Sequence, residues 1–244
     1  MPTETNPSPR RALITGASSG IGEATARTFA QAGFDVALVA RSAEKLETLA
    51  DELSAHSVSA KAFTIDLSDL NTVKHKVEEI EAAFGYIDVL VNSAGMGYTN
   101  RIGDTPLTDW QRVMDLNLTS VFQVVQAVLP GMRKRANGLI INVASIAAQT
   151  AFENWGAYGV SKAALAALSK ALSVEEAANG IRVVALFPGS VDTPIWDTDT
   201  VQADFERSAM LDAQTVAQTI LYTASLPANA LLSDITLTPA KGAL

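Results

Sequence analysis

The segment Thr15-Gly16-Ala17-Ser18-Ser19-Gly20-Ile21-Gly22 decides the fold, because it joins the apolar run Ala12-Leu13-Ile14 to a helical pattern through three glycines. Glycine permits a sharp turn and a close approach of backbone N–H groups to a ligand, and the helix that follows presents its positive dipole end. A tight turn without a ligand is the alternative, since Gly-x-x-x-Gly-x-Gly departs from the usual dinucleotide spacing. The residues that we expect to hold a cofactor pyrophosphate are Gly16, Ser18, Ser19, Gly20, Ile21 and Gly22.

Strand and helix patterns alternate from this junction to the C-terminus. Ser42 and Ser68 precede two of the predicted helices as caps, and Asn179-Gly180 ends a third. The alternation predicts an α/β fold with one doubly wound parallel sheet, helices on both faces, and ligands beyond the carboxyl ends of the strands. The predicted strands are 12–14, 36–40, 62–65, 89–91, 139–143, 183–187 and 235–237, and the predicted helices are 22–32, 43–55, 70–84, 108–135, 157–179 and 213–225.

Composition and charge define the class of protein. The chain has 244 residues, of which 48% are hydrophobic and 18% charged, with no proline- or glycine-rich linker in its middle. We therefore expect a single domain over residues 11–244 with a large core. Residues 1–10 are polar and predict a flexible tail that is neither a signal peptide nor an anchor. A net charge of -8 argues against nucleic acid or an anionic membrane as a partner.

The chain contains no cysteine, which excludes disulfides, thiolate catalysis and cysteine metal sites, and is compatible with a reducing, cytoplasmic compartment. The most apolar stretch, Ala163 to Leu172, is far shorter than the roughly 20 residues that span a bilayer. His56 and His75 lie outside every motif and lack the spacing of metal ligands. We expect no metal site.

The end of the second predicted strand indicates which dinucleotide binds. An acidic residue there binds the ribose 2′-hydroxyl of NAD, whereas an arginine pairs with the 2′-phosphate of NADP. Arg41 and Ser42 follow this strand and no acidic residue does. This favours NADP(H) over NAD(H), and an ordinary solvated Arg41 is the alternative.

Two further strand ends complete the predicted cofactor site. Asp66 and Leu67 directly follow the third strand, where the carboxylate either accepts a hydrogen bond from the adenine amino group or caps the next helix. Asn92, Ala94 and Gly95 end the fourth strand and the turn after it with small residues, which let a ring approach the backbone. A plain strand-terminating turn is the alternative there.

Tyr158 and Lys162 open a long predicted helix and lie on one face of it, so the ammonium group stands beside the phenol. A unit charge about 4 Å away, at an effective dielectric constant of about 20, is worth about 4 kcal/mol or roughly three pKa units. We therefore expect Lys162 to lower the pKa of Tyr158 enough for general acid–base catalysis. A surface pair is the alternative, because Tyr-x-x-x-Lys alone is a weak signal.

Two more polar residues are candidates for the same site. Ser145 follows the fifth strand, at the sheet edge where a substrate should sit, and its hydroxyl can hold the substrate oxygen near Tyr158. A loop or cap serine is the alternative. Asn117 stands between leucines in a helical run, where an amide has weak helix propensity and needs a partner when buried. A satisfied core amide is the alternative for Asn117.

Taken together, the motifs resemble the short-chain dehydrogenase/reductase family in order and spacing, from about Arg11 to the last strand. The resemblance implies a Rossmann-type NAD(P)(H) oxidoreductase with an Asn-Ser-Tyr-Lys tetrad. The residues that carry it are Thr15 to Gly22, Asn92 to Gly95, Asn117, Ser145, Tyr158, Lys162 and Pro188-Gly189-Ser190-Val191-Asp192-Thr193.

The resemblance also implies a role for each member of the tetrad. Tyr158 would be the acid/base, and Lys162 would lower its pKa and hold the nicotinamide ribose. Ser145 would orient the substrate, and Asn117 would hold a water molecule in a proton relay. The residues implied to bind the nicotinamide end are Pro188, Gly189, Val191 and Thr193.

Two departures from the family pattern stand out. Ser93 replaces the commoner second asparagine of Asn-Asn-Ala-Gly, which matters little. The segment Leu237-Thr238-Pro239-Ala240 lacks the usual glycine-rich ending, which argues against a carrier-protein ketoreductase.

The segment Ser190 to Met210 is predicted to cover the substrate pocket. No arginine cluster marks it as a clamp for phosphate or carboxylate, so we expect a largely apolar carbonyl or alcohol substrate. Ordinary core positions are the alternative for each aromatic residue. The side chains expected to line the pocket are Trp196, Phe205 and Met210 on the cover, and Met96, Tyr98 and Trp155 on the opposite wall.

Alanine and leucine lie on more than one face of the helix after Tyr158, which predicts that subunits pack there. The family resemblance adds that the long helices near Asn117 and Tyr158 often build homodimers or homotetramers. The basic run Arg133-Lys134-Arg135 is explained by the dipole of a helix end better than by an acidic carrier protein.

The function that fits these residues best is an NADP(H)-dependent carbonyl reductase, reversible as an alcohol dehydrogenase. Three alternatives are a 3-oxoacyl-carrier-protein reductase, a non-catalytic NADPH-binding scaffold or sensor, and an isomerase or dehydratase of the same superfamily. The complete tetrad weighs against the scaffold, and the absence of a longer substrate domain weighs against the isomerase.

Overall fold

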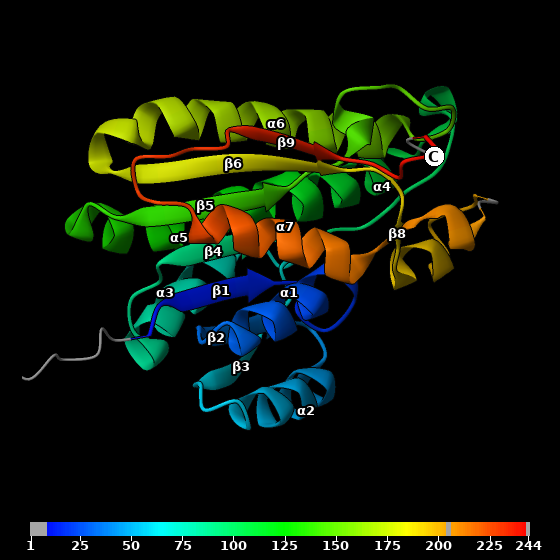
Figure 1. Ribbon diagram of the computed structural model, residues 1–244. Coiled ribbons are helices and arrows are strands. Elements are labelled where there is room, and N and C mark those ends of the chain that lie inside the picture. Colours follow the sequence, from blue (N-terminus) through cyan, green and yellow to red (C-terminus); the bar gives the residue numbers. More distant parts are fainter. Residues whose placement is uncertain (1–8, 204–205, 243–244) are drawn as a thin grey trace, which may run out of the picture.

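A seven-stranded parallel sheet runs through the centre of the protein, of which the computed structural model describes residues 9–203 and 206–242 (Figure 1). Its order is β3-β2-β1-β4-β5-β6-β9, with every neighbouring pair parallel. The direction of winding reverses between β1 and β4, and ligands bind at such a switch point. The strands are β1 Arg11–Thr15, β2 Asp35–Ala40, β3 Ala60–Thr64, β4 Val89–Asn92, β5 Gly138–Val143, β6 Ile181–Pro188 and β9 Asp234–Leu237.

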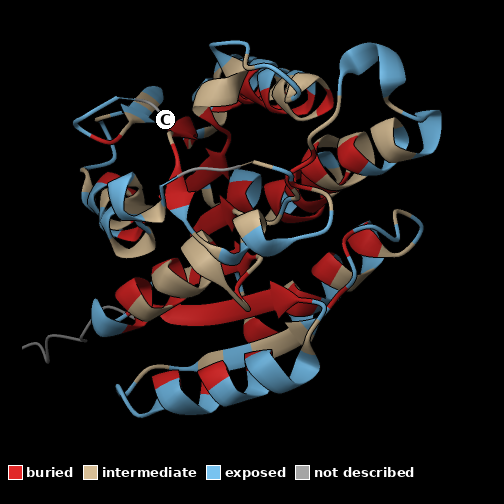
Figure 2. Cartoon of the chain, turned by 90° about the vertical axis from the view of Figure 1, so that its right-hand side faces the viewer, coloured by how far each residue is buried: buried red, intermediate tan, exposed pale blue. Residues whose placement is uncertain are grey.

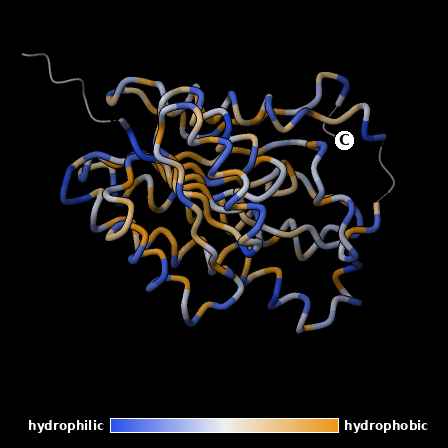
Figure 3. The backbone as a smooth tube through the Cα atoms, turned by 90° about the horizontal axis from the view of Figure 1, so that it is seen from below, coloured by the Kyte–Doolittle hydropathy of each residue, from blue (hydrophilic) through white to orange (hydrophobic). Residues whose placement is uncertain are grey.

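Helices cover both faces of the sheet. Ala12 and Ile14 of β1 pack with α1, α2 and α7 on one face, whereas Leu13 packs with α3, α5 and α6 on the other. Figure 2 shows the central strands and the inward helix faces buried, whereas the edge strands β3 and β9 are only partly buried. Figure 3 shows the most hydrophobic backbone gathered at the centre. The helices are α1 Gly20–Gln31, α2 Ala43–Ser54, α3 Val73–Phe84, α4 Leu107–Met114, α5 Ser120–Arg135, α6 Gly156–Glu176 and α7 Ala213–Ser225.

This architecture confirms the doubly wound parallel sheet predicted from the sequence, with a strand at each predicted run. Gly180 ends the helical stretch after α6 with a left-handed φ of 71°, as expected for a helix end. The predicted cap at Ser68 is wrong. Its backbone N–H and hydroxyl both donate to Asp66 Oδ1, at 2.9 and 2.7 Å, and α3 begins only at Val73 after Thr72.

The predicted helix 108–135 is interrupted by a π-helical turn, Asp115–Thr119, between α4 and α5. The whole stretch Leu107–Arg135 is long and apolar enough, by length and composition, to cross a membrane. The prediction that the most apolar stretch is 163–172 therefore overlooks this longer one. Half of the apolar window is buried, because α5 packs on the sheet and against α3, which is how a core helix behaves.

A second, two-stranded parallel sheet pairs β7 Val191–Asp192 with β8 Leu211–Asp212. Between them lie two short 3-10 turns, η5 Pro194–Asp197 and η6 Arg207–Ala209. We call residues 191–203 and 206–212 the lid segment.

At the N-terminal end of the chain, residues 1–8 of the predicted tail lie outside the described residues. Arg10, the last residue of that predicted tail, donates to the Ala224 carbonyl at 2.8 Å.

Candidate active site

The glycine-rich turn after β1 forms a cradle at the switch point. Gly16 has a left-handed φ of 69°, and a Cβ there would stand 2.9 Å from the Ala94 backbone. A Cβ on Gly22 would overlap the Gly16 carbonyl. Helix α1 begins at Gly20, and Ser19 before it makes no side-chain capping bond. Ser18, Ser19 and Ile21 are half-buried on the same turn, so the cradle fits the phosphates of a dinucleotide at a helix N-terminus.

Thr15 fastens this turn to the end of β4. Its Oγ1 accepts hydrogen bonds from the backbone N–H groups of Ser93 and Ala94, both at 3.1 Å. Asn92 is predicted to bind the cofactor, but its side-chain amide nitrogen Nδ2 donates to Asn142 Oδ1 of β5 at 2.8 Å. This hydrogen bond joins β4 to β5. Asn92 Oδ1 is a buried acceptor without a partner among the described residues.

Arg41 lies exposed beyond β2 and makes no hydrogen bond or ion pair in the described parts of the chain. The neighbouring Asp66 carboxyl is held by Ser68, whose hydrogen bonds lower the pKa of Asp66, with smaller contributions from Arg41 and Lys76. The Leu67 side chain is buried in the core on the face of the sheet that α3 and α5 cover. Ser42 precedes α2 without a side-chain capping bond.

The catalytic candidates Ser145 and Tyr158 meet on one side of a cavity beyond the carboxyl ends of the central strands. Ser145 begins the short turn after β5, where its Oγ accepts from the Ala147 N–H at 3.1 Å. Burial raises the pKa of Tyr158, and a hydrogen bond from Ser145 opposes this only in part. Lys162 lines the same cavity, one helical turn after Tyr158.

The expected lowering of the Tyr158 pKa by Lys162 is therefore wrong for the protein in this structure. The Lys162 Nζ lies 5.8 Å from the Tyr158 ring centroid and donates to the Val143 carbonyl at 2.9 Å. Burial also lowers the pKa of Lys162 itself, to about 8. Because both groups leave water, loss of solvation governs both pKa values.

Asn117 stands in the π-helical turn and is completely buried. Its Oδ1 accepts from the Met96 N–H at 2.8 Å, and its Nδ2 donates to the Met96 carbonyl and to Ser161 Oγ, both at 3.0 Å. Ser161 Oγ in turn donates to the Tyr158 carbonyl at 2.7 Å. The side chain is thus satisfied by protein groups and ties the end of β4 to α6, and its part in a water relay stays a prediction.

The same cavity gathers the residues predicted for the nicotinamide end. Gly95 faces Lys162, since a Cβ there would stand 3.4 Å from Lys162 Nζ. Thr193 reaches the glycine-rich turn, because a Cβ on Gly20 would stand 3.1 Å from the Thr193 side chain. The other predicted cofactor residues on the cavity wall are Ile21, Pro188, Gly189 and Val191.

The substrate side of the cavity is aromatic and apolar. Met96, Trp155 and Trp196 line it as predicted, whereas Phe152 and Ile195 were missed. Phe152 lies in an irregular segment and Ile195 in the short 3-10 turn η5, and neither segment is long enough for a periodic pattern to mark the residue.

Three other predictions for the pocket wall have different outcomes. Tyr98 is not on the wall, because it is 7% exposed and its hydroxyl donates to Asp109 Oδ2 at 2.9 Å. Met210 does not line the cavity either. Phe205 lies outside the described residues. Within residues 9–203 and 206–242, no group of three or more His, Cys, Asp or Glu side chains is arranged to hold a metal ion.

Comparison with known proteins identifies the family. A family model described as short chain dehydrogenase matches residues 10–204. The chain belongs to the short-chain dehydrogenase family. Among curated relatives of this short-chain dehydrogenase, an uncharacterised oxidoreductase of Staphylococcus epidermidis is 34% identical over 228 residues, which cover 93% of this chain and 96% of the relative. The protein is therefore an oxidoreductase with a nucleotide-binding Rossmann fold.

Solved structures of an alcohol dehydrogenase and of a ketoacyl reductase share this fold. An alcohol dehydrogenase from the archaeon Thermococcus sibiricus, complexed with 5-hydroxy-NADP, is 28% identical with a TM-score of 0.87, covering 96% of this chain and 97% of that one. A 3-ketoacyl-(acyl-carrier-protein) reductase from Brucella melitensis, complexed with NADH, is 28% identical with a TM-score of 0.85, covering 93% and 96%. Both phosphorylated and unphosphorylated dinucleotides thus occur among similar folds.

Proposed function

We propose that this short-chain dehydrogenase is an NADP(H)-dependent carbonyl reductase, reversible as an alcohol dehydrogenase, acting on a largely apolar carbonyl or secondary alcohol. The observation that carries the proposal is that Ser145, Tyr158 and Lys162 share one cavity with Gly95 and Thr193. Proton-transfer groups and the site for a nicotinamide ring thereby face the same space. The aromatic wall opposite them suits an apolar substrate.

Each residue has a defined task in the reaction. When bound, NADPH supplies the hydride that reduces the carbonyl carbon. Tyr158 is protonated at neutral pH, as an ordinary tyrosine is, and burial raises the pKa of its phenol further. Its O–H therefore donates to the carbonyl oxygen, and its proton completes the alcohol. Ser145 holds that oxygen beside the phenol. The Lys162 ammonium stabilises the phenolate left behind, and Val143 fixes its direction.

The proposed preference for NADP(H) rests on Arg41. Its guanidinium stands exposed at the carboxyl end of β2, makes no hydrogen bond or ion pair in the described parts of the chain, and acts on Asp66 only through its charge. A guanidinium pairs well with a 2′-phosphate. The NADP-type ligand of the Thermococcus sibiricus enzyme supports this choice. The adenine end would lie beside Asp66 and Leu67 at the end of β3.

A second candidate function is reduction of a 3-oxoacyl group on a carrier protein. The similarity to the Brucella melitensis reductase favours it, whereas the C-terminal segment after β9 lacks the glycine-rich ending. A 3-oxoacyl thioester in the substrate panel separates the two functions, because the carrier-type enzyme should prefer it to simple ketones.

We also propose a homodimer or homotetramer, with α5 and α6 at the subunit contact. Arg133 on α5 pairs with Glu176 on α6, so the two helices lie side by side with their C-terminal ends together. Phe122 near the start of α5 is 43% exposed and Val160 near the start of α6 is 44% exposed, and large apolar groups exposed on neighbouring helices are typical of an interface. A cytoplasmic location remains a proposal that rests on the absence of cysteine.

The experiment that tests the function follows the oxidation of NADPH and of NADH against a panel of ketones, aldehydes and 3-oxoacyl thioesters. We expect turnover of an apolar ketone and a higher kcat/KM with NADPH. Arg41→Asp should move the preference toward NADH. Tight binding of NADPH with no turnover of any substrate would instead support the scaffold or sensor.

A further inference from the structure

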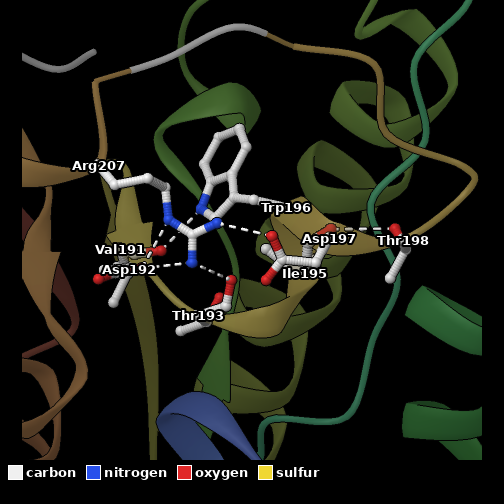
Figure 4. Close-up of polar contacts among 8 residues, drawn as sticks. All are labelled: Val191, Asp192, Thr193, Ile195, Trp196, Asp197, Thr198 and Arg207. Carbon is white, nitrogen blue, oxygen red and sulfur yellow. Dashed lines mark hydrogen bonds and ion pairs between the residues drawn. The ribbon is translucent and has the colours of Figure 1, made fainter.

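Arg207 holds one part of the lid segment to another (Figure 4). Its Nε donates to Asp192 Oδ1 at 2.6 Å, and a second guanidinium nitrogen also contacts that carboxylate. Nη1 donates to Asp197 Oδ1 at 3.0 Å, and Nη2 donates to the Thr193 carbonyl at 3.2 Å. We call this set the Arg207 clasp. It joins η6 to β7 and η5 and so fixes both ends of the stretch that contains Trp196.

Trp196 connects the clasp to the catalytic tyrosine through aromatic contacts. Its Nε1 donates to the Val191 carbonyl at 2.7 Å, beside the clasp. Its ring centroid lies 5.7 Å from that of Trp155, and the Trp155 centroid lies 5.2 Å from that of Tyr158. The two pairs meet at 69° and 70°, which is the edge-to-face geometry that aromatic rings prefer. All three rings line the substrate cavity.

The clasp differs from an ordinary surface ion pair. Isolated exposed pairs contribute little to stability, but a guanidinium that forks to two carboxylates and a carbonyl forms a network of fixed geometry. The chain contains a matched comparator in Arg27, which bridges Glu23 and Glu52 between α1 and α2. The side chains of Arg207 and Arg27 are 39% and 40% exposed. Arg207 contacts Thr193, which lines the cavity, whereas neither of the Arg27 partners, Glu23 and Glu52, lines it.

We propose that Arg207 is a positioning residue that fixes Trp196 against Trp155, and that the resulting aromatic wall selects carbonyl substrates bearing a planar ring over small aliphatic ones. An aromatic substituent gains edge-to-face contacts from two indoles held at a defined angle, whereas a short alkyl group gains little from that geometry. The proposed substrate selection rests on the proposed function, because the selection is measured through carbonyl reduction. The proposed positioning of Trp196 by Arg207 does not depend on that function.

The test compares Arg207→Met with Arg27→Met in the full chain. The activity readout is the ratio of kcat/KM for acetophenone to that for 2-butanone, measured with NADPH. Because the clasp also holds Thr193 in the proposed nicotinamide site, a change in cofactor binding affects both ketones alike and cancels in the ratio. We expect the ratio to fall about tenfold in Arg207→Met, the size of one or two lost aromatic contacts, and to stay unchanged in Arg27→Met.

A second readout needs no turnover. Two indoles at this distance give an exciton couplet in circular dichroism, which should disappear in Arg207→Met and in Trp155→Phe and persist in Arg27→Met. Arg207→Lys keeps the charge but not the fork, so it should not restore the ratio. Asp197→Asn removes one of the clasp's charged partners and should lower the ratio partway, which provides a milder variant if Arg207→Met folds poorly.

An unchanged ketone ratio in Arg207→Met, or a couplet that persists in it, would overturn the inference. A parent protein that binds NADPH and reduces neither ketone would contradict the proposed function. In that case the couplet still decides whether Arg207 positions Trp196, and quenching of tryptophan fluorescence by acetophenone against 2-butanone decides the selection.

Discussion

Tyr158 and Lys162 stand one turn apart on α6, yet burial moves their pKa values in opposite directions. The pKa of Tyr158 is raised, which keeps the phenol protonated and ready to donate. The pKa of Lys162 falls to about 8, so its charge is sensitive to pH near neutrality. Two groups with separated protonation ranges at one site are the usual arrangement for acid–base catalysis.

The pH dependence of the reduction should follow Lys162. Its ammonium loses a proton as pH rises through about 8, while Tyr158, with a raised pKa, stays protonated. The kcat/KM for ketone reduction should therefore fall above about pH 8, and in Lys162→Arg any remaining activity should fall only at higher pH. A profile in the parent that stays flat to pH 10 would contradict this assignment.

The stability of the folded protein should carry the same signature. The pKa of Lys162 is lower in the folded state than its ordinary value of 10.5. Keeping the proton on Lys162 in the folded protein therefore lowers the free energy of unfolding. The penalty is complete below about pH 8 and is relieved between about 8 and 10.5. Relative to Lys162→Met, the parent should gain about 3 kcal/mol of unfolding free energy over that interval. Denaturant titrations at pH 7 and 10.5 measure it, and an equal difference at both pH values would refute it.

At the scale of elements, the sheet edge and the glycine-rich turn do most to define the site. Local periodicity and glycine spacing are enough to predict them, because a buried strand and a strand-to-helix turn depend on residues that are close together in the sequence. The turn tolerates no side chain at Gly22, where a Cβ overlaps the Gly16 carbonyl.

Gly22→Ala should therefore open the turn and weaken cofactor binding. Overpacking of this kind costs about 1–3 kcal/mol, which corresponds to roughly a tenfold or larger rise in the Kd for NADPH. Gly103→Ala is the matched control, because no atom stands within 4 Å of its added Cβ. Fluorescence titration with NADPH measures both. Equal affinity in Gly22→Ala and the parent would show that the cradle does not bind phosphate.

Features that depend on distant contacts could not be predicted from the sequence. The π-helical turn accommodates Asn117, whose partners Met96 and Ser161 lie far away in the chain. Because the helical periodicity of 108–135 does not reveal these distant partners, it predicts one unbroken helix. The direction of the Tyr158 pKa depends on how deeply the phenol is buried, which spacing on a helix does not reveal. Tyr98 pairs with Asp109 in a contact that no motif marks.

At the scale of the whole molecule, we expect a second copy of the chain to pack on the outer faces of α5 and α6. Light scattering at micromolar concentration should give a mass that is two or four times the 25.7 kDa of one chain. Phe122→Asp should shift the mass toward the monomer, since it places a charge at an exposed apolar position on the proposed subunit contact. Tyr222→Asp on α7 serves as the control, because Tyr222 is also exposed but lies on the other face of the sheet. A monomeric parent would contradict the proposed assembly.

The central claim is that the Tyr158 phenol gives its proton to the carbonyl oxygen, and the most direct measurement is ketone reduction by Tyr158→Phe. Phenylalanine keeps the ring contact with Trp155 and removes only the hydroxyl. We predict that kcat/KM falls at least about 100-fold, while the Kd for NADPH stays within a few-fold of the parent. Reduction at the parental rate in Tyr158→Phe would contradict the account.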